Sequence, residues 1–281
     1  HQKPALIEVH LAVLLFGLAG LFGKWLTLAP VIIVWGRASF AALSLLLWLK
    51  GDFGLRSKSS KALITFVLSG ALLAVHWVAF FKSIQLSTVA IGLLTFSSFP
   101  LFTVFLGIIL ERKGISWREI VLSIGCTLGV GLVAPPISWE STMWQGACWG
   151  IFSGFTFAIL AWVNKGLVQS SSGQQIAGWQ NGVAALVLLP WVIQDLPSVV
   201  LSEWVLLVLL GVVFTAISHS LFIRSMVQLR PQTVSLIASL EPVYGILAAW
   251  LILQEVPSLQ KIAGGTIILG ITLWASLARK K

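Results

Sequence analysis

Charged residues are scarce in this sequence. Only 10% of its 281 residues are Asp, Glu, Lys or Arg, and nine of these are acidic. A water-soluble domain carries about a quarter charged residues, because its surface must be hydrated. A chain with so few charges and 58% hydrophobic residues would present an apolar surface, which lipid accepts and water does not. The composition therefore predicts an integral membrane protein.

Cysteine and other chemically reactive patterns are equally sparse. The two cysteines, Cys126 and Cys148, lie in or beside apolar runs, which indicates small packing residues rather than a disulfide framework. The sequence contains no nucleotide-binding Gly-rich loop, no metal-ligand spacing and no Ser/His/Asp grouping. We therefore expect no enzyme activity, no metal, no cofactor and no ATP-driven pumping by this chain.

Basic residues outnumber acidic ones and give a net charge of +9. In a soluble protein this excess would suggest a nucleic-acid partner. Here the basic residues form short clusters between apolar runs, for example at 50–61 and 112–118, without a continuous basic stripe. We expect the lipid bilayer and a small molecule as partners, and no nucleic acid.

Ten apolar runs are long enough to cross a bilayer, which takes about 20 residues of helix. Their lengths favour helices over barrel strands, which are about ten residues long and alternate strictly. The first run continues into a multi-span pattern, so we do not interpret it as a cleaved signal. The predicted fold is an all-α integral membrane protein with spans at 6–24, 31–49, 62–82, 87–110, 117–134, 145–164, 174–193, 203–223, 232–253 and 259–277.

Lys and Arg are distributed unevenly between the two sides that these spans define. With ten spans the termini share a side, and fourteen of the 18 basic residues fall on it. Loops rich in Lys and Arg remain in the cytoplasm. We therefore expect a multi-pass protein of the plasma (inner) membrane with both termini cytoplasmic.

The second half of the sequence resembles the first. The fourth span reads TVAIGLLTFSSFPLFTVFLGIILE at 88–111, and the ninth reads TVSLIASLEPVYGILAAWLILQE at 233–255. Five spans per half predict two inverted repeats, 1–137 and 138–281. Inverted repeats are typical of transporters, which bind substrate at the repeat interface and expose it alternately to each side.

Two motifs stand out: Trp35-Gly36-Arg37 followed by Ala41-Ala42-Leu43, and Leu240-Glu241-Pro242-Val243 with Glu255 closing the same span. Together with the two halves of five spans, these motifs resemble the EamA-type family of the drug/metabolite transporter superfamily, along essentially the whole chain. The first half departs from this pattern, because Ser97-Ser98 stands opposite Glu241-Pro242 and the proline is shifted to Pro100. The resemblance implies secondary transport through a central cavity lined by spans one, three, four, six, eight and nine.

Charged side chains inside the spans must face a partner or a hydrated cavity, because the membrane interior penalises charge. Arg37 is interpreted either as a clamp on a substrate carboxylate or as a structural contact between helices. The structural role is favoured, since the family often has Arg here whatever the substrate. Glu241, beside Pro242, is a candidate proton-coupling site or a local cap. Lys82, near a span end, either reaches water or gives the vestibule a positive field.

His76 and His219 occupy related places in spans three and eight. Histidine is the side chain best suited to change charge near neutral pH, although a histidine in a membrane also serves as a hydrogen-bonded packing residue. On a helix, His76, Phe80 and Ser83 share one face, which predicts a mixed aromatic and polar pore wall.

Small polar residues in the fourth span allow helices to approach closely and leave room for a ligand near Trp162. Gly125 and Gly129, four residues apart, predict helix packing only. The candidate substrate-binding residues are His76, Trp77, Thr95, Ser98, Trp162, His219 and Glu241, and the candidate coupling or structural charges are Arg37, Glu241 and Lys82.

We expect a secondary transporter of small organic metabolites, most simply an exporter of amino-acid-like or amphipathic aromatic compounds, acting as a monomer or homodimer with possible proton coupling. The first alternative is an uptake carrier for a nutrient or cofactor. A distant alternative is a membrane enzyme or scaffold.

Overall fold

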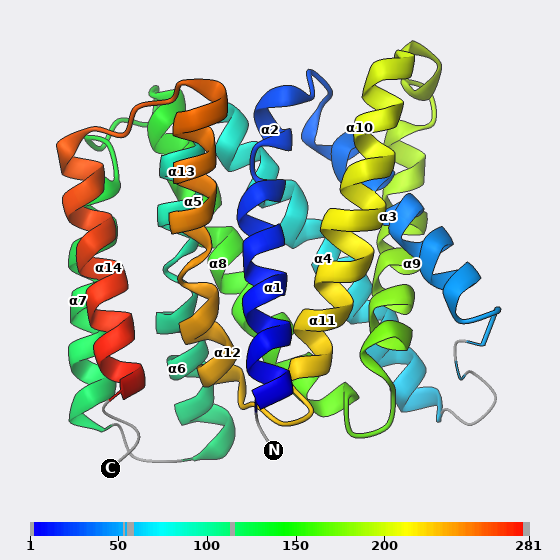
Figure 1. Ribbon diagram of the computed structural model, residues 1–281, viewed down its shortest axis with the longest axis horizontal. Helices are drawn as coiled ribbons and strands as arrows, with labels where there is room; N and C mark the ends of the chain where they lie inside the picture. The colour runs from blue at the N-terminus through cyan, green and yellow to red at the C-terminus, as the bar shows by residue number, and fades with distance from the viewer. Residues whose placement is uncertain (1–2, 53, 55–58, 113–115, 278–281) are drawn as a thin grey trace.

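The computed structural model describes residues 3–52, 54, 59–112 and 116–277. Within these ranges the chain consists of helices, turns and loops, with no β-strand (Figure 1). The extreme ends of the two predicted repeats lie outside the described residues. So do six basic residues that contribute to the predicted orientation: Arg56, Lys58, Lys113, Arg279, Lys280 and Lys281.

Each of the ten apolar runs coincides with a helix or with consecutive helices. The helices are α1 (Lys3–Ala19), α2 (Phe22–Trp25), α3 (Pro30–Trp48), α4 (Ser60–Leu86), α5 (Val89–Phe96), α6 (Phe99–Glu111), α7 (Trp117–Val133), α8 (Thr142–Leu167), α9 (Gly173–Val192), the short 3₁₀ helix η2 (Leu196–Ser198), α10 (Leu201–Gly211), the π-helix η3 (Val212–Ile217), α11 (Ser218–Ser225), α12 (Pro231–Ala238), α13 (Glu241–Leu253) and α14 (Leu259–Leu277).

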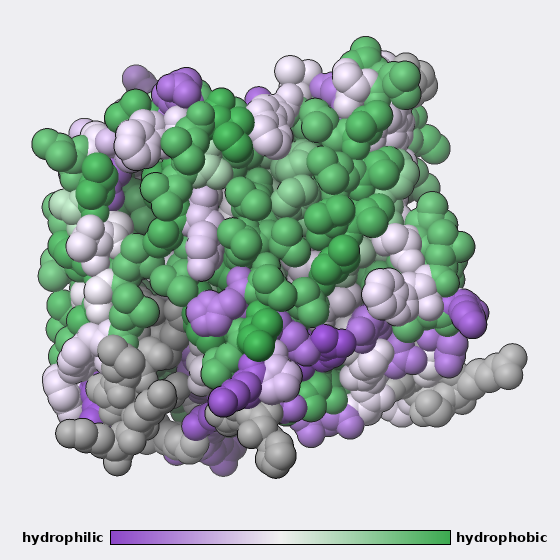
Figure 2. All heavy atoms as spheres, viewed as in Figure 1, coloured by the Kyte–Doolittle hydropathy of each residue, from purple (hydrophilic) through white to green (hydrophobic). Residues whose placement is uncertain are grey.

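Six helical segments of the described chain are long and apolar enough to cross a membrane: Lys3–Trp25, Pro30–Trp48, Ser60–Leu86, Val89–Glu111, Thr142–Leu167 and Leu201–Ser225. Large apolar side chains cover the outside of the bundle, among them the exposed Leu47, Leu186 and Leu251. Figure 2 shows this apolar surface across the middle of the molecule, with polar residues gathered along the lower edge. The helices therefore suit a hydrocarbon environment.

The fourth and ninth runs are interrupted in the same way. Each consists of an eight-residue helix, a two-residue break and a thirteen-residue helix. The breaks are Ser97-Ser98 and Ser239-Leu240, and Pro100 and Pro242 are each the second residue of the longer helix. This register corrects the sequence comparison, in which Pro100 was shifted. Proline has no N–H and is tolerated in the first helical turn, so both helices restart one residue before it.

The helices pack into one bundle with a separate pair at its side. In the bundle, α4 packs against α8 and α9, α3 against α9, and α1 against α11 and α13. The pair is α7 with α14, at the left of Figure 1. A β-carbon on Gly129 would lie 2.9 Å from the Gly264 carbonyl oxygen, and one on Gly125 would lie 2.7 Å from Ile271. The interpretation of both glycines as packing residues is confirmed.

Candidate functional site

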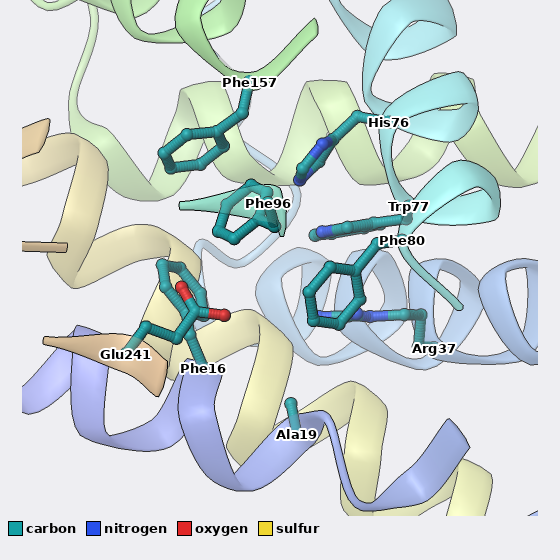
Figure 3. Close-up of a pocket in the computed structure, with 9 residues that line it drawn as sticks. All are labelled: Phe16, Ala19, Arg37, His76, Trp77, Phe80, Phe96, Phe157 and Glu241. Atoms are coloured by element: carbon teal, nitrogen blue, oxygen red, sulfur yellow. The ribbon is translucent and has the colours of Figure 1, made fainter. Parts of the chain in front are cut away.

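A central cavity of about 30 Å³ lies where α1, α3, α4, α5, α8 and α13 meet (Figure 3). It has room for water but not for an organic metabolite. Five lining residues are aromatic, and the wall carries one charge of each sign. The lining residues are Phe16, Ala19, Arg37, His76, Trp77, Phe80, Phe96, Phe157 and Glu241.

Arg37 is held firmly in the cavity wall. Its side chain is 2% exposed, and its Nε donates a 2.9 Å hydrogen bond to Thr215 Oγ1. The guanidinium lies 3.9 Å from the centroid of the Trp77 ring, a distance at which the ring face attracts a cation. Thr215 belongs to the π-helix and donates in turn to the Leu210 carbonyl at 2.7 Å. Arg37 is thus both a contact between helices and a cationic group of the cavity.

Glu241 occupies the first position of α13, directly after the break in the ninth run. It is 3% exposed, and in Figure 3 its carboxylate points into the cavity near Phe16. A helix N-terminus stabilises negative charge, and Arg37 lines the same cavity. The break therefore delivers an acidic group to the centre of the bundle.

His76 contributes a ring whose orientation is fixed by α8. Its Nδ1 lies 3.0 Å from the Ser153 carbonyl oxygen, and Ser153 Oγ donates to the His76 carbonyl at 3.2 Å. Because a carbonyl oxygen only accepts hydrogen bonds, this contact favours a proton on Nδ1. The same ring packs against Phe96 and Phe157, with centroids 5.7 and 5.2 Å away.

His219 lies one side chain away from the cavity. It meets the Trp77 ring edge-on at 5.5 Å, and its Nδ1 is 3.2 Å from the Asn181 side-chain nitrogen. Asn181 also donates to the Ala177 carbonyl at 2.8 Å. His219 therefore packs against Trp77, and the face of the Trp77 ring in turn contacts the Arg37 guanidinium.

The other predicted residues lie in helix contacts around the cavity. Thr95 Oγ1 donates to the Ile91 carbonyl, Trp162 Nε1 donates to the Thr103 carbonyl at 3.1 Å, and Lys82 Nζ lies 4.4 Å from the Trp149 ring centroid. The Ser98 hydroxyl is buried and has no hydrogen-bond partner among the described residues. The shared face predicted for His76, Phe80 and Ser83 divides, because Ser83 donates to the Gly146 carbonyl at 2.6 Å instead of lining the cavity.

Sequence reasoning missed Phe16, Phe96 and Phe157. Phe96 is the last residue of α5 and directly precedes the break at Ser97-Ser98. The Ser-Ser pair in an apolar run could therefore have indicated Phe96 as a cavity residue. Phe16 lies in a uniformly apolar stretch and carries no comparable signal, and Phe157 follows Thr156 in a run that also contains Ser153. The resemblance implied that span eight lines the cavity, but among the described residues span two does so instead, through Arg37.

Two clusters of polar contacts lie where the interrupted runs begin, one at the start of α5 and one at the start of α12. In the α5 cluster, Lys24 Nζ donates to the Ser87 carbonyl at 2.8 Å, and Glu255 accepts from the Val89 N–H at 2.9 Å. The cluster thus joins the end of α2 and the second residue after α13 to the start of α5.

The α12 cluster has the same construction at the start of α12. Lys165 Nζ donates to the Met226 carbonyl at 2.8 Å and the Leu229 carbonyl at 3.3 Å. Glu111 pairs with Arg230 at 2.7 Å. The α2 and α13 ends lie at the top of Figure 1 and the start of α12 at the bottom, so the two clusters close opposite ends of the bundle.

Comparison with known proteins gives the family. The sequence model of the EamA-like transporter family matches residues 3–134 and 144–277. The chain is 24% identical over 254 residues to an uncharacterized transporter, YxxF, of Bacillus subtilis (strain 168), with 87% of this chain and 80% of the relative covered. It is 24% identical over 215 residues to a protein of Rickettsia bellii (strain RML369-C) named S-adenosylmethionine uptake transporter, covering 76% of this chain and 73% of the relative.

A solved crystal structure shares the fold. It superposes with a TM-score of 0.74 at 16% sequence identity and covers 100% of this chain and 99% of its own. The family match spans both halves of the sequence, and the apolar helices make the protein a multi-pass membrane protein whose partners are the lipid bilayer and a small-molecule substrate. The chain belongs to the EamA-like transporter family of the drug/metabolite transporter superfamily.

Proposed function

We propose that this protein is a secondary transporter that carries an amino-acid-like or amphipathic aromatic metabolite by alternating access. In this proposal ten spans form two inverted repeats, 1–137 and 138–281, with the central cavity between them. The observation that carries the proposal is the pair of opposite charges, Arg37 and Glu241, in the wall of one buried aromatic cavity.

Helix pairing supports the two repeats. If each span of the first half is exchanged with its counterpart in the second, the pairing of α4 with α8 becomes that of α11 with α1, and both occur. The pairing of α5 with α13 becomes that of α12 with α6, which also occurs, and the pairings of α3 with α9 and of α7 with α14 exchange into themselves. The two stretches that the family model matches fall on either side of 135–143.

The two end clusters support alternating access. Lys24 and Lys165 each donate a hydrogen bond to a backbone carbonyl just after a span ends. Glu255 and Glu111 each follow or end the longer helix of an interrupted run, and each contacts the start of the short helix, α5 or α12, in the opposite half. Opening the α5 cluster while the α12 cluster stays closed would expose the cavity to one side, and the reverse would expose it to the other. The small central cavity corresponds to the state in which both are closed.

The charges and rings of the cavity support the substrate class. Glu241 suits an ammonium group, and a guanidinium suits a carboxylate because it donates paired hydrogen bonds. The rings of Phe16, Phe96 and Phe157 suit an apolar or aromatic substrate group. A carboxylate in a hydrated cavity also suits proton coupling, for which Glu241 is the proposed site.

Export is the proposed direction, from the inner membrane of a cell with both chain termini in the cytoplasm. The distribution of Lys and Arg supports this orientation. The second candidate is uptake of an amino-acid-like cofactor, which is favoured by relatives named S-adenosylmethionine uptake transporters. Either direction uses the same cavity.

Flux through proteoliposomes tests the function. The purified full chain is reconstituted, and a radiolabelled panel of amino acids, aromatic metabolites and S-adenosylmethionine is offered with and without a pH gradient. We expect flux of at least one member above that of empty liposomes and above that of the Glu241→Gln variant. Absence of flux for the whole panel would overturn the proposed substrate class, and equal flux with Glu241→Gln would overturn the role of Glu241.

A further inference from the structure

A second cavity, of about 230 Å³, opens on the side of the bundle between α3, α9, the π-helix and α11. Much of its wall is apolar, with Leu45, Val212, Ile217 and Leu221. Two of its rim residues, Trp48 and Ile217, are 71% and 41% exposed on the outer surface. The opening therefore faces the region that hydrocarbon occupies in a membrane.

One end of this cavity is polar. Trp48 ends α3, and Arg224 lies in the last turn of α11. Glu8, near the start of α1, binds one nitrogen of Arg224 at 2.7 Å. The polar end thus lies toward the side of the bundle on which the chain begins (Figure 1). In the proposed topology this is the headgroup level of the cytoplasmic leaflet.

Two polar groups in the cavity wall point to a ligand. The Ser220 side chain is 6% exposed, and its hydroxyl has no hydrogen-bond partner within the described part of the chain. A buried hydroxyl without a partner is costly, and rotation about the Cα–Cβ bond toward a polar ligand atom in the cavity removes that cost. The Arg224 guanidinium has five N–H donors, its side chain is 45% exposed, and only Nη2 contacts Glu8 in that ion pair.

We propose that this cavity binds an anionic phospholipid of the leaflet nearer the chain termini. The phosphate binds Arg224, a glycerol or ester oxygen accepts from Ser220, and one acyl chain lies along Leu45 and Ile217. Basic pockets between helices on the cytoplasmic side are suited to anionic headgroups, and the cavity combines such a basic rim with an apolar interior.

The lipid site shares a wall with the machinery of the central cavity. Val212, Ala216 and Ile217 belong to the π-helix, whose Thr215 holds Arg37. An acyl chain packed against these three residues stabilises the π-helical turn and, through Thr215, the position of Arg37. The lipid-binding claim itself does not depend on the proposed substrate or on transport.

Native mass spectrometry of the purified full chain tests the proposal with phosphatidylglycerol and phosphatidylcholine of identical acyl chains. The wild type should retain phosphatidylglycerol about fivefold better, as expected for one additional basic contact. Ser220→Leu, which fills the cavity, and Arg224→Gln should remove this preference. Arg118→Gln is the matched control, because Arg118 lies in α7 and does not line the cavity.

A second measurement needs no variant. Phosphatidylglycerol with a diazirine at its acyl end is photo-crosslinked to the wild type, and labelling within 212–221 is expected. Equal retention of the two lipids by the wild type would overturn the proposal in favour of ordinary hydrocarbon contact. So would labelling that avoids these residues, or a preference for phosphatidylglycerol that survives in both cavity variants.

Discussion

At the scale of single residues, the two charges of the central cavity are held differently. Arg37 is fixed by a hydrogen bond to Thr215 and by the face of Trp77. Glu241 enters the cavity from a helix start and lines it together with Arg37, without a hydrogen bond to it among the described residues. We therefore propose that Arg37 is a rigidly held partner for a substrate carboxylate and that Glu241 is the group that responds to protons or to a substrate ammonium group.

The substitution Glu241→Gln separates coupling from binding. Glutamine keeps the side-chain size but cannot take up a proton, so accumulation driven by a pH gradient should be lost. Exchange of labelled for unlabelled substrate should persist with a raised KM, because exchange needs no net proton movement but glutamine binds an ammonium group more weakly than glutamate does. Glu140→Gln, a change in an exposed loop, is the control. Gradient-driven accumulation at the wild-type level in Glu241→Gln would rule out this role.

The contact between Arg37 and Thr215 can be measured by a double-mutant cycle. Thr215→Val preserves volume and removes the hydroxyl, so we expect a loss of about 1.5–3 kcal/mol, as for a hydrogen bond to a charged group. Arg37→Lys loses the same contact, and the double variant should be less destabilised than the sum of the two. Thermal unfolding in detergent gives the comparison. Strict additivity would show that the two side chains act independently.

At the scale of helices, hydropathy located the spans, but it could not find their breaks or their inward faces. The breaks in the fourth and ninth runs depend on where Pro100 and Pro242 stop backbone hydrogen bonding, and two half-matching sequences gave the wrong register. Phe157 lines the cavity while Phe105 is 57% exposed. Both are phenylalanine in an apolar run, so composition does not distinguish a cavity residue from a lipid-facing one.

The end clusters predict opposite effects for two equivalent glutamates. Glu255→Gln weakens the α5 cluster and should expose the cavity to the side on which that cluster lies, and Glu111→Gln should expose it to the other. The measurement is labelling of Ala19→Cys by a membrane-impermeant thiol reagent added to either side. Cys126 and Cys148, the two cysteines of the chain, are first changed to Ala. Labelling that rises on the same side in both variants would refute the assignment of the clusters to opposite gates.

At the scale of the whole molecule, α1 begins and α14 ends at the same end of the bundle (Figure 1), as an even number of spans requires. Composition and run lengths were sufficient to predict a helical membrane protein, and the motifs around Arg37 and Glu241 were sufficient for the family. The substrate was not predictable, because it depends on which side chains converge. That convergence is set by tertiary packing of spans far apart in the sequence.

Topology can be mapped with single cysteines in the same cysteine-free background. Ten spans place Ser60 on the cytoplasmic side and Ser138, after five spans, on the opposite side. An impermeant thiol reagent added to intact cells should therefore label Ser138→Cys and not Ser60→Cys, and disrupted cells should show both. Labelling of both positions in intact cells, or of Ser60→Cys alone, would contradict the inverted arrangement.

The π-helix at 212–217 has a consequence for how this protein changes over generations. Such a turn accommodates one extra residue, while the flanking α-helical segments keep the faces they would have without it. Loss of one codon within this stretch would leave Leu207 against Gly36 and His219 against Trp77. It would remove the widened turn in which Thr215 reaches Arg37. One codon inserted or deleted in this stretch can therefore create or remove the hydrogen bond from Arg37 to Thr215, while the packing contacts of the rest of the span are kept.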